Sequence, residues 1–465
     1  MIPALTKLKL FCKVHLPVVC HADWDNGLIQ FLGTSRSIVE RAACPGRTGS
    51  QQMFLKLRQP IDETEYPTPR ILEAGRTYKY PFTFVVPDRL LPQVCTHEKK
   101  NAHIHRSHTM LPPSLGDPMV AGNNGKTLQD DMAPEMSQIS YVVRVGVLKR
   151  SSTDQRQLKA LANIAKKIRI IPIVEEEPPI NVVNHSYYCT RKEKSVKRGF
   201  LRGKLGRLVA SSAQPKPIRL SPPNCEARDT VSTAATVQLR FDPVGNEKPP
   251  RLGSMTSKLK ASTFFSAGPW EDFPSQSGNL PFSQVGQGLY TESVHLSTMC
   301  VASAQWEKQS ASSEADRRPS SLSQSSEDST GPSDGFTGDT YYTASVVVPV
   351  TVPNHKTFVP TFHSCLLSRT YSLDVSLSWH TPGTNVLTPS ISLRLPIQIT
   401  TQTKDDSLIK STLGMVVSQE EMDQFFSPRS VSPPTDNTVV DVNLAPPEYS
   451  ETIPAPRMQA ILATS

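Results

Sequence analysis

The segment Ala445-Pro446-Pro447-Glu448-Tyr449 has residue types and spacing suited to binding a partner protein. Consecutive prolines favour a left-handed polyproline II helix, so little conformational entropy remains to be lost on binding. Tyr449 lies on the same side of this three-fold helix as the first proline of the pair. Grooves lined by aromatic residues, above all those of WW domains, recognise this shape. The motif therefore predicts a WW-domain-binding site at Pro446, Pro447 and Tyr449.

A basic run between Arg191 and Arg207 contains a single acidic residue, Glu193. Such a run suits contact with an anionic lipid surface or with an acidic or phosphorylated peptide tail, and its lysines could also accept ubiquitin. It is equally typical of a solvated outer strand that needs no partner. Nucleic-acid binding is not expected, because the basic residues are not interleaved with aromatic residues for base stacking. The candidate contact residues are Lys192, Lys194, Lys197, Arg198, Arg202, Lys204 and Arg207.

Thiol and imidazole side chains crowd into one short stretch, at Cys95, His97, His103, His105 and His108. Zinc prefers such ligands, but structural zinc sites generally use paired ligand modules on turns, and no Cys-x-x-Cys pair occurs in the chain. We therefore expect an ordinary loop here and predict no metal site.

Sequence motifs of catalysis are missing. The stretch Gly199–Lys204 is one residue short of a phosphate-binding loop, and Leu205 replaces the Ser or Thr that would bind magnesium. The one Gly-x-Ser-x-Gly sequence, Gly331–Gly335, falls in a Ser- and Gly-rich stretch and not at a strand-to-helix elbow, and no His-Glu-x-x-His or strand-associated Gly-x-Gly-x-x-Gly sequence occurs. We predict a protein that is not an enzyme and needs no cofactor.

Three serines stand in candidate phosphorylation contexts. Ser320 follows Arg317-Arg318-Pro319, and Ser427 and Ser432 each precede a proline. Phosphorylation would add about two negative charges at each site and so dock or release a segment. Short patterns of this kind also arise by chance in Ser-rich segments.

The composition favours folded β domains joined to Pro- and Ser-rich segments. The chain has 465 residues, 37% of them hydrophobic, and its 41 prolines outnumber its 23 glycines. The formal net charge of +8 is modest for this length. Eight scattered cysteines are typical of free thiols in a reducing compartment. Lys7, Lys9 and Lys13 interrupt the apolar N-terminus, so we expect neither a signal peptide nor a membrane span, and place the protein in the cytosol.

Hydrophobic alternation predicts strands along most of the chain. The aromatic residues of Tyr78–Phe84 recur at a period of two and so line one face of a strand, in which Pro81 indicates an edge or a bulge. Leu8–Val14 and Ile139–Leu148 read as further strands, whereas Gln155–Ile168 reads as a short helix that turns extended. Alternation resumes in the second half, over 233–241, 258–265, 293–304, 341–352, 370–379 and 390–400.

Changes in composition divide the chain into four parts. We expect an N-terminal lobe over 1–175, with its first strands divergent or missing, and an interlobe linker over 176–190. A C-terminal lobe follows over 191–402 and carries a low-complexity insertion at about 307–340. We expect residues 403–465 to form a disordered tail that contains the Pro-Pro-x-Tyr motif. The economical fold is an all-β one with two β-sandwiches.

Several segments, in order, carry a family resemblance. Gly75–Pro87 followed by Leu90-Leu91-Pro92 resembles the late strands of an arrestin N-terminal domain, most closely that of the fungal α-arrestins, the arrestin-related trafficking adaptors. The second half resembles the second arrestin lobe. The supporting segments are 29–33, 111–117, 139–143, 199–220 and 341–400, so the resemblance covers roughly residues 25–402.

This resemblance implies a fold and a function. The fold is two arrestin-like, immunoglobulin-like β-sandwich lobes. Members of the family bind cytosolic tails of membrane transporters or receptors, and a Pro-Pro-x-Tyr motif recruits a WW-domain HECT-type ubiquitin ligase that promotes cargo ubiquitination and endocytosis. Carried onto this chain, the motif is Pro446, Pro447 and Tyr449, and the protein is expected peripherally at the plasma membrane or endosomes. The alternative is an arrestin-fold scaffold in signalling or vesicle sorting that acts without a ubiquitin ligase.

Overall fold

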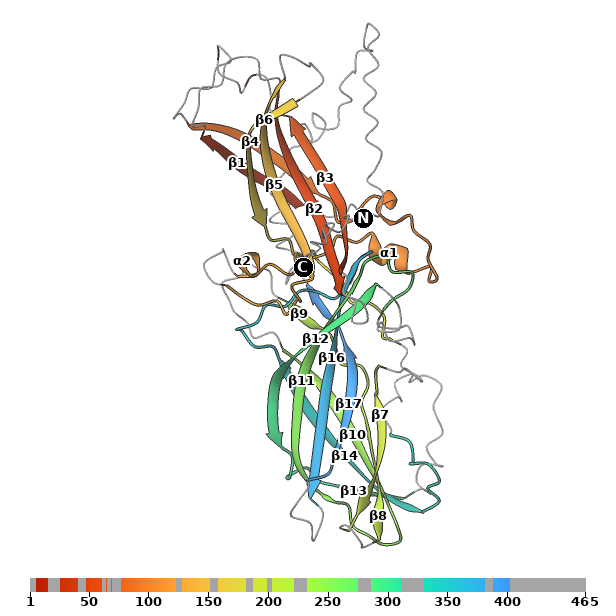
Figure 1. The fold of residues 1–465 in the computed structure, drawn as a ribbon. Coiled ribbons are helices and arrows are strands. Elements are labelled where there is room, and N and C mark those ends of the chain that lie inside the picture. The colour runs from red at the N-terminus through yellow and green to blue at the C-terminus, as the bar shows by residue number, and fades with distance from the viewer. Residues whose placement is uncertain are drawn as a thin grey trace, which may run out of the picture.

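The chain forms two β-lobes placed end to end in an elongated molecule (Figure 1). The all-β fold expected from the sequence is confirmed by the computed structural model. None of the described helices has the length and apolar character needed to cross a membrane. The structure describes residues 6–15, 26–40, 47–60, 64, 68, 77–122, 128–150, 158–180, 187–198, 203–220, 232–274, 286–310, 330–380 and 388–401.

The N-terminal lobe combines a four-stranded antiparallel sheet with a two-stranded pair. The larger sheet has the order β3-β2-β5-β6, and β1 pairs with β4. The strands are β1 (Thr6–His15), β2 (Asn26–Glu40), β3 (Arg47–Pro60), β4 (Thr77–Val86), β5 (Ser137–Arg150) and β6 (Leu158–Ile168).

The aromatic alternation in β4 builds the core of this lobe. Phe82 and Phe84 are buried while Thr83 between them is exposed, as the period of two requires. Their rings lie 5.7 Å apart, and Phe84 also lies 5.9 Å from the ring of Phe31 on β2. Since β4 has one strand partner, β1, the edge placement predicted from Pro81 is confirmed.

Two other sequence expectations have different outcomes. The strand predicted at Leu8–Val14 is confirmed, because β1 runs from Thr6 to His15 along the whole of β4. The short helix predicted at Gln155–Ile168 is wrong, because Leu158–Ile168 is strand β6 and pairs with β5. Cross-strand pairing here overrides the helix preference of the local sequence.

Three short helical turns connect β4 to β5 and lie at the junction of the lobes, with α1 and α2 on opposite sides of it (Figure 1). They are η2 (Pro92–Cys95), α1 (Ile104–His108) and α2 (Pro118–Ala121). Asp117 caps α2, because its carboxylate accepts a hydrogen bond of 3.2 Å from the amide of Met119.

The C-terminal lobe is a sandwich of two sheets. One has the order β13-β14-β10-β8-β7, and the other has the order β12-β11-β16-β15 with β17 paired to β16. A short parallel pair, β9 and β18, completes the lobe. The strands are β7 (Arg191–Lys197), β8 (Lys204–Ser211), β9 (Ile218–Leu220), β10 (Ser232–Pro243), β11 (Arg251–Ser266), β12 (Gln287–Cys300), β13 (Glu307–Ser310), β14 (Thr340–Thr351), β15 (Phe362–His363), β16 (Leu367–His380), β17 (Ser390–Ile397) and β18 (Ile399–Thr401).

The two lobes share an apolar core. The cluster around Phe31 and Tyr141 of the N-terminal lobe also contains buried residues of the C-terminal lobe. These are Phe265, Val359, Phe362, Leu366 and Leu367. The lobes are therefore joined by buried hydrophobic surface as well as by the chain itself.

Gly116 is required where the β4–β5 connection turns towards β5. Its φ of +76° favours glycine, and a Cβ at this position would overlap the carbonyl oxygen of Ser137.

We expect Gly116→Ala to lower the free energy of unfolding by about 1–3 kcal/mol, measured as a fall in melting temperature. Gly146→Ala is the control, because a Cβ on Gly146 would meet no atom within 4 Å. Equal melting temperatures of the two variants would contradict this assignment.

Candidate functional site at the lobe junction

Several residues singled out from the sequence lie outside the described residues. They are the motif residues Pro446, Pro447 and Tyr449, the serines Ser320, Ser427 and Ser432, and Arg202 of the basic run. Their assigned roles stay predictions.

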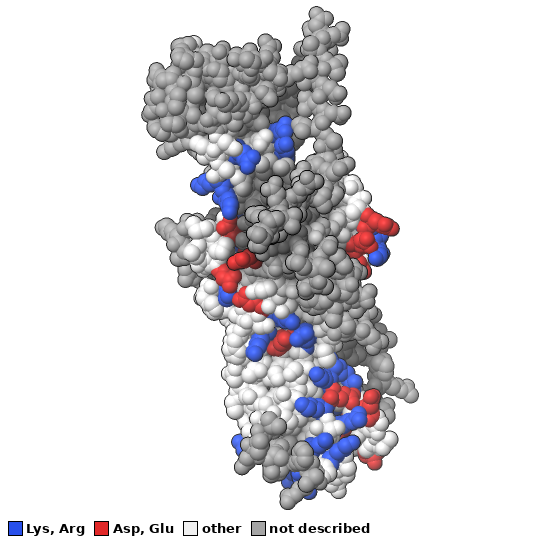
Figure 2. Space-filling view, viewed as in Figure 1, with Lys and Arg blue, Asp and Glu red and all other residues white. Residues whose placement is uncertain are grey.

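The remaining basic run forms the edge strand β7, its neighbour β8 and the start of their connection. Part of its charge is neutralised within the lobe. Arg191 and Arg207 both contact Glu193, at 2.8 and 3.3 Å, and Arg198 pairs with Glu247 at 2.7 Å. Figure 2 shows the consequence, since basic and acidic side chains are interleaved over this end of the C-terminal lobe.

Lys194 is also engaged within the lobe. Its Nζ donates to the main-chain carbonyl of Ser390 at 2.7 Å and lies 5.8 Å from the ring centre of Trp379. Lys192, Lys197 and Lys204 are exposed and make no hydrogen bond or ion pair with another described residue. These three lysines are the part of the run that remains available to an anionic partner. Charge on an edge strand also discourages pairing with other chains.

Charged side chains connect the lobes on the side of α2. Lys356, from the segment between β14 and β15, pairs with Asp130 of the N-terminal lobe at 2.5 Å and with Glu292 of β12 at 2.8 Å. The next residue, Thr357, donates its amide to the main-chain carbonyl of Asp130 at 3.0 Å. The two lobes are thus joined by side-chain and main-chain bonds at the same place.

The neighbouring carboxyl of Asp131 is buried instead. It accepts hydrogen bonds from the amides of Gly116 at 2.6 Å and Ala133 at 3.2 Å. The buried guanidinium of Arg369 on β16 donates to the main-chain carbonyl of Asp131 at 3.1 Å. Burial raises the pKa of the Asp131 carboxyl even though the positive charge of Arg369 acts against this.

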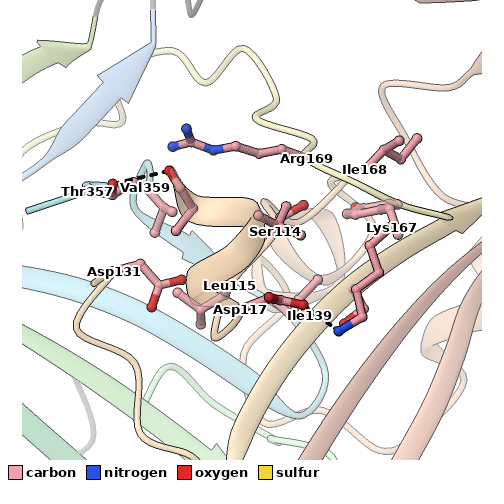
Figure 3. Close-up of a pocket in the computed structure, with 14 residues that line it drawn as sticks. Ser114, Leu115, Asp117, Asp131, Ile139, Lys167, Ile168, Arg169, Thr357 and Val359 are labelled. Atoms are coloured by element: carbon pink, nitrogen blue, oxygen red, sulfur yellow. Dashed lines mark hydrogen bonds and ion pairs between the residues drawn. The ribbon is translucent and has the colours of Figure 1, made fainter. Parts of the chain in front are cut away.

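A narrow pocket opens at this junction (Figure 3). Its walls include Asp131, Arg169 and the Lys167–Asp117 ion pair from the N-terminal lobe, and Thr357 and Val359 from the C-terminal lobe. The free space is about 10 Å³, which is room for a single water molecule. The pocket therefore is not a site for an organic substrate.

On the side of α1, thiol and imidazole groups from both lobes meet. The Sγ of Cys95 lies 3.2 Å from Nε2 of His97 and 3.6 Å from Nδ1 of His108, and these two nitrogens lie 3.2 Å apart. The Sγ of Cys365 lies within 4.8 Å of all three atoms. We refer to Cys95, His97, His108 and Cys365 as the junction cluster.

The sequence revealed only part of the junction cluster. Cys95, His97 and His108 are close together in the sequence, where an ordinary loop is predicted, whereas Cys365 lies in the turn between β15 and β16 of the other lobe. His103 and His105, which belong to the same crowd, are not in the cluster. Hydrogen bonding to Cys365, and then to His108 and His97, lowers the pKa of the Cys95 thiol, although burial acts against this.

Part of the N-terminal lobe is similar in sequence to a known protein family. Residues 44–197 match the family model described as the Bul1 N terminus. No curated protein sequence matches the chain. The matched range contains Cys95, His97 and His108, whereas Cys365 lies beyond it.

Asp130 and Asp131 should respond oppositely to pH. Burial raises the pKa of Asp130 too, but the hydrogen bonds from Lys356 and the Met132 amide outweigh it, so the net pKa is lowered. The raised pKa of Asp131 means that its contribution to stability is greatest at low pH and is lost as pH rises through the folded-state pKa. The lowered pKa of Asp130 means that its contribution is present above the ordinary carboxyl pKa and is lost as pH falls.

The measurement is the melting temperature as a function of pH for wild type, Asp131→Asn and Asp130→Asn. As pH falls from neutral into the carboxyl range, wild type should gain stability relative to Asp131→Asn and lose it relative to Asp130→Asn. Parallel curves for the two variants would contradict the assigned environments.

Proposed function

We propose that the whole chain brings a WW-domain HECT-type ubiquitin ligase to membrane cargo, from the premise that residues 44–197 match the N-terminal domain of arrestin-related, Bul1-type adaptors. The observation that carries the proposal is that one chain contains both this domain and the sequence Pro446-Pro447-Glu448-Tyr449. The family is one of adaptors, and we infer that this chain acts by binding, without catalysis of its own.

In the proposed mechanism the two lobes recognise cytosolic tails of transporters or receptors at the plasma membrane or endosomes. The Pro-Pro-x-Tyr segment lies in sequence beyond β18, the last described strand. A ligase held there would be kept close to the cargo, and its effective concentration at cargo lysines would rise without any new contact between ligase and cargo. Ubiquitination and endocytosis of the cargo would follow.

The basic edge of the C-terminal lobe supplies a second element of the proposal. Lys192, Lys197 and Lys204, which pair with no other residue in the described part of the chain, would attract anionic lipid or an acidic cargo tail. Each basic residue near an anionic surface contributes about 1 kcal/mol. Three such residues would orient the adaptor at a membrane without binding it tightly.

Tyr449→Ala tests the ligase-recruiting motif. We expect this change to abolish co-precipitation of a WW-domain HECT-type ligase and to reduce ubiquitination of the cargo, because the tyrosine fills the aromatic groove of the WW domain. The melting temperature should not change. Glu448→Ala is the matched control, since Glu448 occupies the variable position of the motif, and it should retain ligase binding.

Retained ligase binding in Tyr449→Ala would overturn the role of the motif. Unchanged cargo ubiquitination together with impaired signalling or sorting would favour the alternative, an arrestin-fold scaffold that acts without a ubiquitin ligase.

Replacement of Lys192, Lys197 and Lys204 by Gln tests the basic edge. Binding to vesicles that contain anionic lipid should fall by up to about a hundredfold, because roughly 3 kcal/mol of attraction is removed, and cosedimentation measures it. The control replaces Lys216, Lys248 and Lys308, exposed lysines of the same lobe, and carries the same change in net charge. Equal losses in both triple variants would show that net charge alone matters.

A further inference from the structure

We propose that the junction cluster, Cys95, His97, His108 and Cys365, is a tetrahedral binding site for a zinc ion that links the two lobes. Nothing in this inference depends on the proposed ligase adaptor function. It rests on the type, the spacing, the orientation and the burial of four side chains.

The donor set has the chemistry of a structural zinc site. Two cysteine sulfurs and two imidazole nitrogens form the Cys₂His₂ set that binds Zn²⁺ in closed four-coordinate sites. Magnesium and calcium prefer oxygen ligands, and the cluster offers none. The four side chains would fill all four coordination positions of the ion and leave none open for a substrate, so the site would have a structural role.

The distances fit a tetrahedron of zinc ligands. With ordinary Zn–N and Zn–S bond lengths, ligand atoms lie about 3.3 Å apart for two nitrogens, 3.6 Å for nitrogen and sulfur, and 3.8 Å for two sulfurs. In the cluster, the nitrogens of His97 and His108 lie 3.2 Å apart. They lie 3.2 and 3.6 Å from the sulfur of Cys95. The sulfur of Cys365 closes the set within 4.8 Å.

The imidazole rings are oriented as metal ligands. Nδ1 of His97 is 2.9 Å from the main-chain carbonyl of Glu98, which can only accept a hydrogen bond, so Nδ1 carries the proton. The lone pair of Nε2 then faces the cluster, as in a zinc-bound histidine whose other nitrogen donates to a carbonyl. His108, at the end of α1, is buried and turns its Nδ1 to the same point.

Charge balance also favours a divalent cation. Cys95 and Cys365 are both buried, with 1% of their surface exposed, and His108 is equally buried. Zinc binds cysteine as the thiolate, so any proton still on either sulfur would leave to solvent, and two thiolates and one Zn²⁺ form a neutral group. Neutrality matters here because an isolated buried charge is strongly disfavoured.

The placement of the ligands gives the ion its role. Cys95 ends η2, His97 follows it and His108 ends α1, all within the β4–β5 connection of the N-terminal lobe. Cys365 belongs to the β15–β16 turn of the C-terminal lobe. Coordination would therefore join the lobes directly, beside the Lys100–Glu271 ion pair, which connects them at 2.7 Å.

The test is metal content of the full-length chain purified in the presence of a thiol reductant. We expect about one zinc ion per chain by elemental analysis. Cys365→Ser and His108→Ala should each lose most of it. Cys300→Ser should keep it and is the matched control, because Cys300 is exposed and lies outside the cluster. Chelation should lower the melting temperature of wild type and leave that of Cys365→Ser unchanged.

A second measurement does not depend on the folding of a variant. Cobalt(II) added to the metal-stripped wild-type chain should give the intense visible bands of a tetrahedral site together with a thiolate-to-cobalt charge-transfer band. Wild type without zinc and without these bands would overturn the proposal. So would a disulfide between Cys95 and Cys365 in the unreduced chain, identified by peptide mass spectrometry, because the two sulfurs would then be bonded to each other instead of to a metal ion.

Discussion

A fully buried guanidinium lies between the lobes, and among the described residues only its Nη2 has a hydrogen-bond partner, whereas Nε and Nη1 have none. Arg369 has no exposed surface, and removal of its charge from water costs several kcal/mol unless polar groups compensate. The main-chain carbonyl of Asp131 accepts a hydrogen bond from Nη2, and the ring of Tyr371 lies 5.9 Å from the guanidinium. The buried carboxyl of Asp131 adds the opposite charge nearby. One arginine of the C-terminal lobe thereby fixes the position of a loop in the N-terminal lobe.

That loop is strained, and its strain has a visible compensation. Met132 has a φ of +59°, which is uncommon for a side chain of its size. The carboxylate of Asp130 accepts a hydrogen bond from the Met132 amide at 2.7 Å, and that of Asp131 accepts one from the Ala133 amide. A conformation of this kind costs of order 1–3 kcal/mol and persists where its surroundings determine it. Here Arg369 and Lys356 hold the two aspartates that hold the turn.

The sequence predicted the strands better than the junction, for a physical reason. The alternation of apolar and polar residues in Tyr78–Phe84 and Ile139–Leu148 can be recognised within each segment alone. It arises because one face of a strand is buried and the other is solvated. Leu158–Ile168 was predicted as a helix because its Ala, Leu and Lys residues favour helices, but pairing with β5 makes it a strand. Three residues of the junction cluster lie close together in the sequence, but the fold is what brings Cys365 beside them. Likewise, Arg198 is neutralised by Glu247, from a distant loop.

The free energy of burial at the lobe junction limits how far the two lobes can move relative to each other. Separation of the lobes would expose Phe265, Phe362, Leu366 and Leu367, which pack in the core of the N-terminal lobe. Each such side chain contributes about 1.5–3 kcal/mol by burial, so even partial exposure exceeds the roughly 1–3 kcal/mol by which a ligand usually couples two sites. Arg369 and Lys356 add to this barrier. Relative rotation of the lobes is therefore an unfavourable switch.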